Sequence, residues 1–365
     1  MPPRLNSRIP LMALGVLSLI AALWAGLIRI GWQLPALIPL LPAAHGPLMV
    51  AGFLGTVISL ERAVALAAVI PGKGKFVYVV PLLAGVGALT LLIGLPTFLG
   101  RGLITLASLG LVIAFTVILR LHFDTATVTM GVGSLLWLIG NALWLIGQSI
   151  PQAAPWWAGY LALTIAGERL ELAKVLLLRR NTLIAFGLTV AVFIAGLVFS
   201  FFAFDFGIRL GGVGLIGLGL WLLRCDIATR TIRQTGLTRF IAACLLPGYV
   251  WLVVGGGLWL WFGGGHTAGP IHDAALHAIF LGFVFSMIFG HAPIIIPAVV
   301  GIEIPYRRVF YLHLGLLHAS LIARIAGDLL SLPSLRAWGG LWNVIAVTLF
   351  AATTAWSVVS RRRSS

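Results

Sequence analysis

The chain has 365 residues, of which 60% are hydrophobic and only 9% are charged, and its mean hydropathy is +1.09. This composition excludes a soluble globular protein, and several apolar runs exceed the ~20 residues that cross a bilayer, so the sequence predicts an integral membrane protein made of α-helices. The basic residues behind the net charge of +15 lie in short loops, where they indicate membrane orientation and contact with anionic lipid headgroups, not nucleic-acid binding.

In chain order, the apolar runs predict twelve membrane-spanning helices. We expect them at about residues 11–30, 44–68, 77–95, 102–121, 127–147, 155–177, 182–204, 208–224, 239–262, 272–292, 308–330 and 336–359. No polar stretch is long enough for a soluble domain, so residues 1–365 are expected to form one polytopic membrane domain. The first span has no small-residue cleavage site after it, and we expect it to be a retained helix.

Basic residues are unequally divided between the two sides of this membrane domain. Most of them fall in alternate loops on one side. The loops on the other side hold only four: Arg29, Arg101, Arg209 and Arg336. By the positive-inside rule, both termini are expected in the cytoplasm, with the loops at 31–43, 148–154 and 263–271 outside a bacterial inner membrane.

The segment 272–297 combines an apolar, helix-length run with three histidines. Ionisable side chains are costly inside a membrane helix and are therefore candidate functional residues. His291 follows His277 by 14 residues, which places the two roughly 40° apart around one helix and about 21 Å apart along it. The expected topology sorts the membrane histidines by depth into an outer group (His45, His277 and, at its edge, His272) and an inner group (His291, His313 and His318).

Two histidines from different helices at one depth are what a bis-histidine haem requires, because imidazole is the nitrogen ligand for haem iron and for copper. The outer pair His45 and His277 meets this condition, and His291 with His313 forms an inner candidate. No CxxCH motif is present, so a haem would be b-type and non-covalent. A copper site needs about three histidines, which the inner group supplies only if His318 also turns inward. The alternative for all of them is hydrogen bonding to neighbouring helices.

Charged residues inside the spans form a second candidate set. Glu61-Arg62 lies in the second predicted span and Glu168-Arg169 in the sixth, and this repeated dipeptide is weak evidence for an internal repeat. Arg324 and Asp328 are four residues apart, which predicts that they pair on one helix face. One interpretation is structural ion pairs; the other gives Arg62, Arg169 and Arg324 a role in binding haem propionates or a quinone headgroup, or places the glutamates on a proton path.

Short motifs spread over most of the chain resemble the NnrS family of membrane haem–copper proteins, which is linked to denitrification and nitrosative stress. They are His45 to Phe53, Trp157 to Leu161 with Ala166-Gly167, His277-Ala278 with Leu281-Gly282, and Ala323-Arg324. Similarity to the low-spin haem segment of haem–copper oxidases implies His45 as an axial ligand. The chain departs from the family pattern at Pro47 and Leu48, where the family usually has histidine and glutamate. It also lacks the oxidase His-His and His-x-His pairs, which argues against copper and oxygen reduction.

Three hypotheses fit these residues. The first is a haem-binding inner-membrane protein, with or without copper, that acts in nitric oxide or nitrosative-stress metabolism or passes electrons across the membrane. Its expected partners are the lipid bilayer, a quinol or redox protein, a small gas such as nitric oxide, and further copies of itself. The second is a cofactor-free secondary transporter or channel that uses buried Glu, Arg and His, and broken helices or an inverted repeat would favour it. The third is a membrane assembly factor for a partner oxidase.

Overall fold

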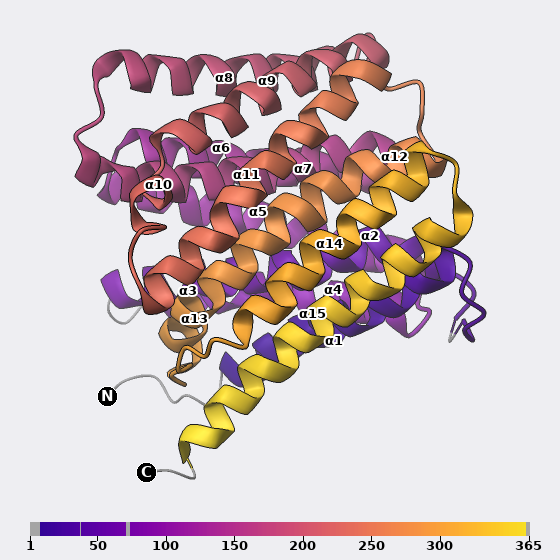
Figure 1. Cartoon of the computed structure of the whole chain (residues 1–365), viewed down its shortest axis with the longest axis horizontal. Helices are drawn as coiled ribbons and strands as arrows, with labels where there is room; N and C mark the ends of the chain where they lie inside the picture. The colour runs from indigo at the N-terminus through magenta and orange to yellow at the C-terminus, as the bar shows by residue number, and fades with distance from the viewer. Residues whose placement is uncertain (1–7, 37, 71–73, 363–365) are drawn as a thin grey trace. The chain divides into compact units, whose positions relative to one another are not determined.

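The computed structural model describes residues 8–36, 38–70 and 74–362, whose regular secondary structure is entirely helical (Figure 1). The α-helices are α1 (Arg8–Arg29), α2 (His45–Pro47), α3 (Thr56–Val69), α4 (Val79–Leu92), α5 (Thr97–Leu121), α6 (Thr125–Leu145), α7 (Ile150–Ala173), α8 (Arg180–Phe199), α9 (Phe204–Cys225), α10 (Ala228–Thr231), α11 (Gly236–Phe262), α12 (Gly269–His277), α13 (Ser286–Val300), α14 (Phe310–Leu329) and α15 (Pro333–Arg362). The π-helical segment η3 (Leu48–Gly55) joins α2 to α3, and a second, η6 (Ala278–Phe285), joins α12 to α13. The remaining helical turns are the 3-10 segments η2 (Pro42–Ala44), η4 (Gly74–Tyr78) and η5 (Lys174–Leu176).

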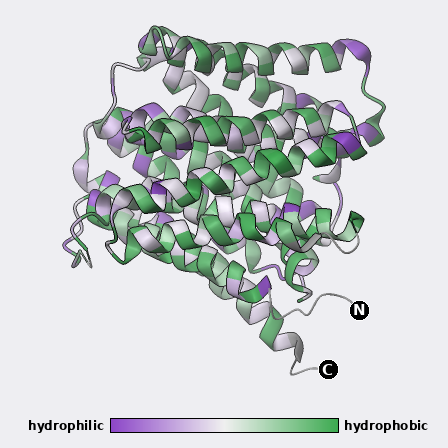
Figure 2. Ribbon diagram, turned by 180° about the vertical axis from the view of Figure 1, so that it is seen from behind, coloured by the Kyte–Doolittle hydropathy of each residue, from purple (hydrophilic) through white to green (hydrophobic). Residues whose placement is uncertain are grey.

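Ten helices in the described part of the chain are long and apolar enough to cross a membrane. They coincide with ten of the twelve predicted spans, and Figure 2 shows helices made mainly of hydrophobic residues, with many of the hydrophilic residues near helix ends. The predicted span 77–95 corresponds to the shorter apolar helix Phe76–Leu92, and 155–177 corresponds to α7, whose second half is charged. The all-helical class is confirmed, whereas the ends of the chain at 1–7 and 363–365 lie outside the described residues.

The chain divides into two compact units, each described by itself. The first unit comprises Met1–Tyr160 with Ile295–Ile302. In it, α1 packs against η3 and α4, α4 against α5, and α5 against α6. Part of its core consists of Ala22 and Ala25 of α1 against Leu48 and Ala88. The small alanine side chains let these helices approach closely, which is the main source of helix association in lipid.

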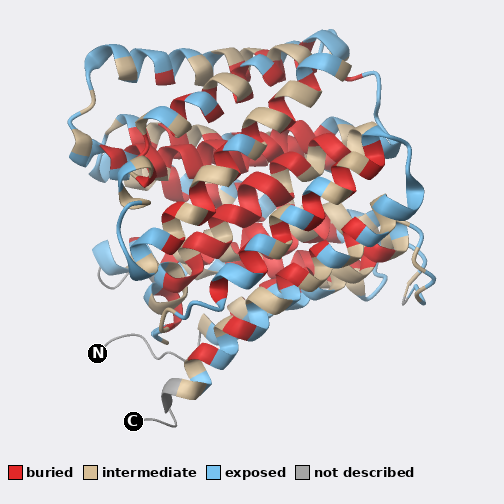
Figure 3. Ribbon diagram, in the orientation of Figure 1, coloured by how far each residue is buried: buried red, intermediate tan, exposed pale blue. Residues whose placement is uncertain are grey.

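The second unit comprises Leu161–Ile294 with Glu303–Ser365. Here α9 packs against α8 and α11, α11 against η6 and α12, and α14 against α12, η6 and α15. Gly212 of α9 and Gly256 of α11 lie against each other's backbone carbonyls, where a side chain would not fit. α8 is mostly exposed (Figure 3), with 22% of its apolar window buried, so most of its surface is available to lipid.

The two spans that contain π-helical segments are the most buried of the ten candidates. Pro42–Val69 has 61% of its apolar window buried and Gly269–Val300 has 67%. Each π-helical segment has eight residues and carries Gly-Phe at its fifth and sixth positions. A π-helical turn contains more residues than an α-helical turn and often occurs at functional sites. These two spans are therefore candidates for a functional site.

A tryptophan from another helix covers a glycine in each π-helical segment. In the first unit the Trp137 ring lies where a side chain on Gly55 would have to be, and in the second unit Trp251 does the same at Gly282. Only glycine leaves room for an indole that close to the helix backbone. The segments therefore share a packing feature as well as a helical type.

Candidate functional site

His45 precedes the π-helical segment of the first unit and is held against α1. Its Nδ1 lies 2.8 Å from the carbonyl oxygen of Ala22, and its ring covers Gly26, where a Cβ would lie 3.0 Å from the imidazole. Because a carbonyl only accepts, Nδ1 carries the proton of this bond, and the neutral ring keeps its lone pair on Nε2. Histidines that ligate metals commonly have this arrangement, with one nitrogen anchored to a carbonyl.

His277 directly precedes the π-helical segment of the second unit, and its Nδ1 is anchored in a similar way. Nδ1 lies 2.8 Å from the backbone oxygen of Asp273 and 3.3 Å from Oδ1 of the same residue. Backbone and carboxylate together fix the ring and again leave the lone pair on Nε2. His45 and His277 belong to different units, so their ligation of one haem stays a prediction.

Asp273 is also the centre of an ion-pair network in the second unit. Its two carboxylate oxygens accept hydrogen bonds from Arg324 of α14, at 2.9 Å from Nε and 3.1 Å from Nη2. Arg336 of α15 lies 3.7 Å from Asp273 and pairs with Asp328 at 2.7 Å. The side chain of Asp328 is 0% exposed and that of Arg324 is 8% exposed. Two acidic and two basic groups therefore compensate one another in a largely buried position.

The predicted pair of Arg324 with Asp328 is wrong, because each residue has its partner on another helix. The four-residue spacing permits the pair, but the packing of α14 against α12 and α15 presents Asp273 to Arg324 and Arg336 to Asp328. Sequence analysis did not single out Asp273. The sequence feature that could have identified Asp273 is its position four residues before His277, because residues at that spacing share one face of a helix.

A second buried ion pair joins Arg169 of α7 to Asp226, just after α9. Nε and Nη2 of Arg169 lie 2.7 and 2.9 Å from the two carboxylate oxygens, and the two side chains are 4% and 0% exposed. Nη1 lies 3.4 Å from Nε2 of His291, whose Nδ1 is 2.7 Å from the carbonyl oxygen of Met287. His291 thus keeps its lone pair on Nε2, but that nitrogen faces a guanidinium, and a metal ion there would have to displace Arg169. Sequence reasoning missed Asp226 because it belongs to a polar connection.

His313 of α14 is 1% exposed and lies among aromatic rings of the second unit. Four ring centroids are 4.9 to 6.1 Å from its own: those of Phe240, Phe289, Phe310 and Phe350. Its Nδ1 lies 3.2 Å from Oγ1 of Thr353, whose hydroxyl has an acceptor of its own in the Leu349 carbonyl at 2.8 Å. Nδ1 is then the donor, and Nε2 is a buried lone-pair nitrogen with no hydrogen-bond partner among the described residues.

Neutral His318 carries its proton on Nε2, whereas neutral His313 carries it on Nδ1. Nδ1 of His318 accepts a hydrogen bond from Nε1 of Trp251 at 3.0 Å, and an indole nitrogen can only donate. The proton of the neutral ring is therefore on Nε2, which cannot ligate a metal without a change of tautomer. This arrangement argues against His318 as the third ligand of a copper site. His313 and His318 also have different neighbours, as their five-residue spacing predicts.

The three arginines predicted to bind propionates or a quinone all have carboxylate partners. Arg169 and Arg324 make the two bidentate pairs described above. Arg62 lies 3.3 Å from Glu61 and its guanidinium is 6.0 Å from the Phe115 ring centroid. Helix-fixing ion pairs therefore account for these charges, and cofactor binding by the same arginines stays a prediction.

An all-helical, multi-pass membrane protein is the class that this fold and these residues define. Its apolar helices contact lipid, while its charged side chains pair in the interior, as they must in a membrane. The chain belongs to the family described as "Domain of unknown function (DUF8744)", which matches residues 8–359 and so includes both units. No curated protein and no solved structure matches the chain.

Proposed function

We propose that this protein binds haem in a bacterial inner membrane. The observation that carries the proposal is the anchoring of His45 and His277, each of which donates from Nδ1 to a backbone carbonyl and so directs its lone pair to Nε2. Both precede π-helical segments in the two most buried spans. Imidazole nitrogen is a common axial ligand of haem b, and these two histidines place one beside each π-helical segment.

The proposed topology has twelve crossings and both termini in the cytoplasm. It needs α4 and α7 in addition to the ten apolar helices. The apolar helix Phe76–Leu92 is at the lower end of the length range that spans a bilayer. α7 has 24 residues and carries Glu168, Arg169 and Glu171 in its second half; the buried partner Asp226 compensates the charge of Arg169.

An inner centre would rest on His313, with His291 as its companion. Nε2 of His313 is buried and has a lone pair. Nε2 of His291 lies against the guanidinium of Arg169, which would have to move before a metal could bind there. Two haems at different depths would let the protein pass electrons across the membrane, with a quinol or redox protein as donor and nitric oxide as a small ligand. Copper fits these residues less well, because the tautomer of His318 opposes it.

Absorption spectra of the detergent-purified protein, oxidised and dithionite-reduced, test the proposal, with iron and copper counted per chain. We expect a Soret shift on reduction with resolved α and β bands, and loss of most of the haem in His45→Ala and in His277→Ala. His266→Ala is the matched control, because His266 is exposed and its ring lies edge-on to Phe262, with the centroids 5.9 Å apart. Full haem content in both ligand variants would refute the assignment.

A secondary transporter is the second candidate, and the π-helical segments, which change the helix geometry within two spans, favour it. Transporters often place their site where helices of corresponding repeats are interrupted, and the network around Asp273 supplies buried ionisable groups beside one such span. A colourless, metal-free preparation from haem-replete cells would favour this function over haem binding. The next variants would then be Asp273→Asn and Glu61→Gln, assayed for the loss of proton uptake by proteoliposomes.

A further inference from the structure

A cleft of about 430 Å³ lies in the second unit where two membrane-crossing helices begin. Its lining residues are Thr235, Gly236 and Arg239 at the start of α11, and Tyr306, Arg308 and Tyr311 before and within the first turn of α14. Because the candidate spans start at Gly236 and Phe310, the cleft is at the boundary of the membrane. Its volume is within the usual range for small-molecule sites.

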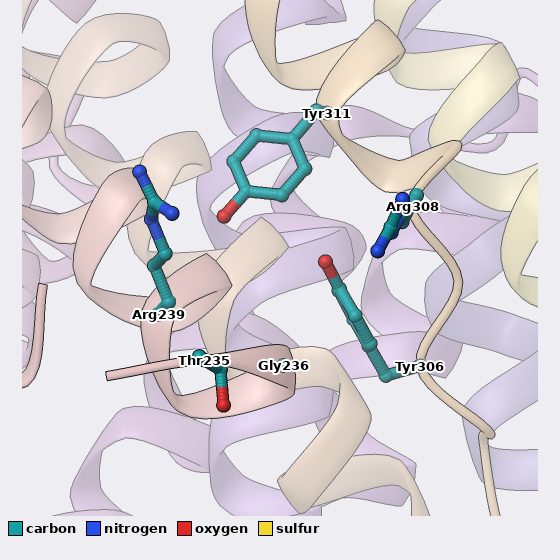
Figure 4. A pocket seen from close by; sticks show the side chains of 6 residues that line it. All are labelled: Thr235, Gly236, Arg239, Tyr306, Arg308 and Tyr311. Atoms are coloured by element: carbon teal, nitrogen blue, oxygen red, sulfur yellow. The ribbon is translucent and has the colours of Figure 1, made fainter. Parts of the chain in front are cut away.

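Apart from Gly236, every residue that lines this cleft has a side-chain hydrogen-bond donor, and none of the described residues that line it is a carboxylate. Figure 4 shows Arg239 and Arg308 on opposite sides, with the hydroxyl groups of Tyr306 and Tyr311 pointing toward each other between them. Two guanidinium groups and two phenol hydroxyls around one cavity can donate hydrogen bonds to the oxygens of a phosphate group. A phosphate accepts such charge-assisted hydrogen bonds from several directions.

The two cleft arginines differ from their neighbour Arg307. Nη2 of Arg307 donates to Ser360 at 3.2 Å and its guanidinium lies 5.5 Å from the Trp356 ring centroid. Neither Arg239 nor Arg308 forms an ion pair or a side-chain hydrogen bond with any residue that the structure describes. These two positive charges are therefore available to a ligand from outside the chain.

The tyrosine rings are held in place by the aromatic cluster beneath them. The ring of Phe240 lies edge-on to Tyr311 at 5.3 Å and tilted to Tyr306 at 6.0 Å, measured between centroids. Phe240 is itself fully buried. The hydroxyl groups are thus presented on supported rings, which lowers the entropy cost of binding.

We propose that this cleft binds a phosphate group and that an anionic phospholipid headgroup supplies it. The position at the starts of two spans favours a lipid, because headgroup phosphates lie at that depth. In the proposed topology this is the cytoplasmic side, where anionic lipids attract basic residues. Soluble phosphate has the same chemistry, and the experiment separates the two sources.

The test is lipid binding to the full-length, detergent-purified protein by native mass spectrometry, with phosphatidylglycerol and phosphatidylcholine titrated separately. We expect the wild type to retain one phosphatidylglycerol per chain in preference to phosphatidylcholine. Arg239→Gln with Arg308→Gln should weaken that binding by about tenfold or more, because two charge-assisted contacts are lost. Tyr306→Phe with Tyr311→Phe keeps the rings and should weaken it by about threefold to fivefold.

The matched control is Arg230→Gln with Arg233→Gln, which removes the same charge from exposed positions outside the cleft. We expect this control to bind phosphatidylglycerol within about twofold of wild type, because neither Arg230 nor Arg233 lines the cleft. Equal weakening in the two double-arginine variants, or no preference for the anionic lipid, would overturn the site. Inorganic phosphate that binds the wild type and displaces the lipid, with both effects lost in the cleft variant, would support the phosphate site but overturn the lipid as its source.

Discussion

In the first unit, the span Pro42–Val69 packs its π-helical segment against α1 and α4. In the second unit, which holds residues 269–294 of the span Gly269–Val300, the π-helical segment packs against α11 and α14. In both cases these neighbours include the membrane-crossing helix before the span and the helix after it. A tryptophan also covers a glycine in each segment, at the eighth position in the first (Gly55) and at the fifth position in the second (Gly282). The recurring element is thus a helix, a span with a π-helical segment, and a helix. It pairs Pro42–Val69 with Gly269–Val300, whereas the repeated Glu-Arg dipeptide would pair Pro42–Val69 with α7.

The polar surroundings of the two spans differ. His45 has a neutral carbonyl as its Nδ1 acceptor, whereas His277 lies beside the carboxylate of Asp273 and its two arginines. With the two π-helical segments aligned residue for residue, Glu61 corresponds to His291. Glu61 pairs with a neighbour on its own helix, while His291 faces the buried Arg169.

The two spans share their packing features but differ in the charged groups around them. The backbone form, the glycines and the covering tryptophans occur in both units, so they serve the close packing of a central span. The buried ion-pair networks occur beside the second span, so charge changes should affect the second unit more than the first. Glycine changes should affect the two units alike.

The largest effect is expected from Asp273→Asn. Loss of this carboxylate leaves Arg324 without its bidentate partner in a mostly buried position, which costs about 3–5 kcal/mol in the free energy of unfolding. Thermal unfolding in detergent measures it. Glu171→Gln is the control, because both side chains of its pair with Lys174 are 45% exposed, and it should cost less than about 1 kcal/mol. Equal effects of the two substitutions would contradict the assignment of Asp273 as a network centre.

Arg169→Met compared with Arg62→Met tests the contrast between units directly. The first leaves Asp226 buried and unpaired and should destabilise the protein by about 3 kcal/mol or more. Arg62, whose partner Glu61 is 25% exposed, should cost about 1 kcal/mol or less. Arg169→Met with Asp226→Leu should recover much of the loss, since a neutral pair leaves no buried charge. If Arg62→Met is as damaging as Arg169→Met in the same unfolding assay, the contrast fails.

Gly55→Ala and Gly282→Ala should have similar effects if the two spans share one packing device. Each new methyl group meets a tryptophan ring, and overpacking of this kind typically costs about 1–3 kcal/mol. Gly257→Ala is the control, because outside its own helix turn no atom of the described residues lies within 4 Å of the added Cβ, and the helix propensity of alanine should stabilise the protein by up to about 1 kcal/mol. Unfolding temperatures of the three variants make the measurement. Destabilisation of one span alone would show that the similarity is superficial.

The smallest effect is expected from Trp251→Phe. It removes the hydrogen bond to His318 and should cost about 1 kcal/mol beyond the loss of packing. Trp137→Phe provides the comparison, because the indole nitrogen of Trp137 is buried without a partner in the described part of the chain. The ¹⁵N shifts of labelled histidine would report the tautomer of His318. An unchanged His318 signal in Trp251→Phe would contradict the tautomer assigned to this ring.

The partners of several charged side chains could not be predicted from the sequence, because they lie on other helices. The spacing of Arg324 and Asp328 favours a pair within one helix, but Asp273 and Arg336 approach from two other helices. Sequence spacing defines which residues share a face of one helix, not which face of a second helix lies opposite. Asp226 illustrates the same point, since its arginine precedes it by 57 residues.

The π-helical segments also left no sequence signal. All eight residues of each segment are apolar or glycine, so an extra residue in the turn does not disturb any pattern of polar and apolar positions. Their location became evident only from the backbone. The histidines that precede them were nevertheless predicted as candidates, because imidazole is rare and costly in an apolar run.

The sequence by itself determined that this is an all-helical membrane protein and where ten of its apolar helices lie. Backbone groups in lipid have no water to bind, so a long apolar run has to form a helix whatever its neighbours are. The tertiary structure decided which charges pair, which histidines keep a lone pair on Nε2, and where the helices widen into π-turns. Those properties depend on which helices meet and at what distance, and in a chain this uniformly apolar that choice is made by the shapes of small side chains at the contacts.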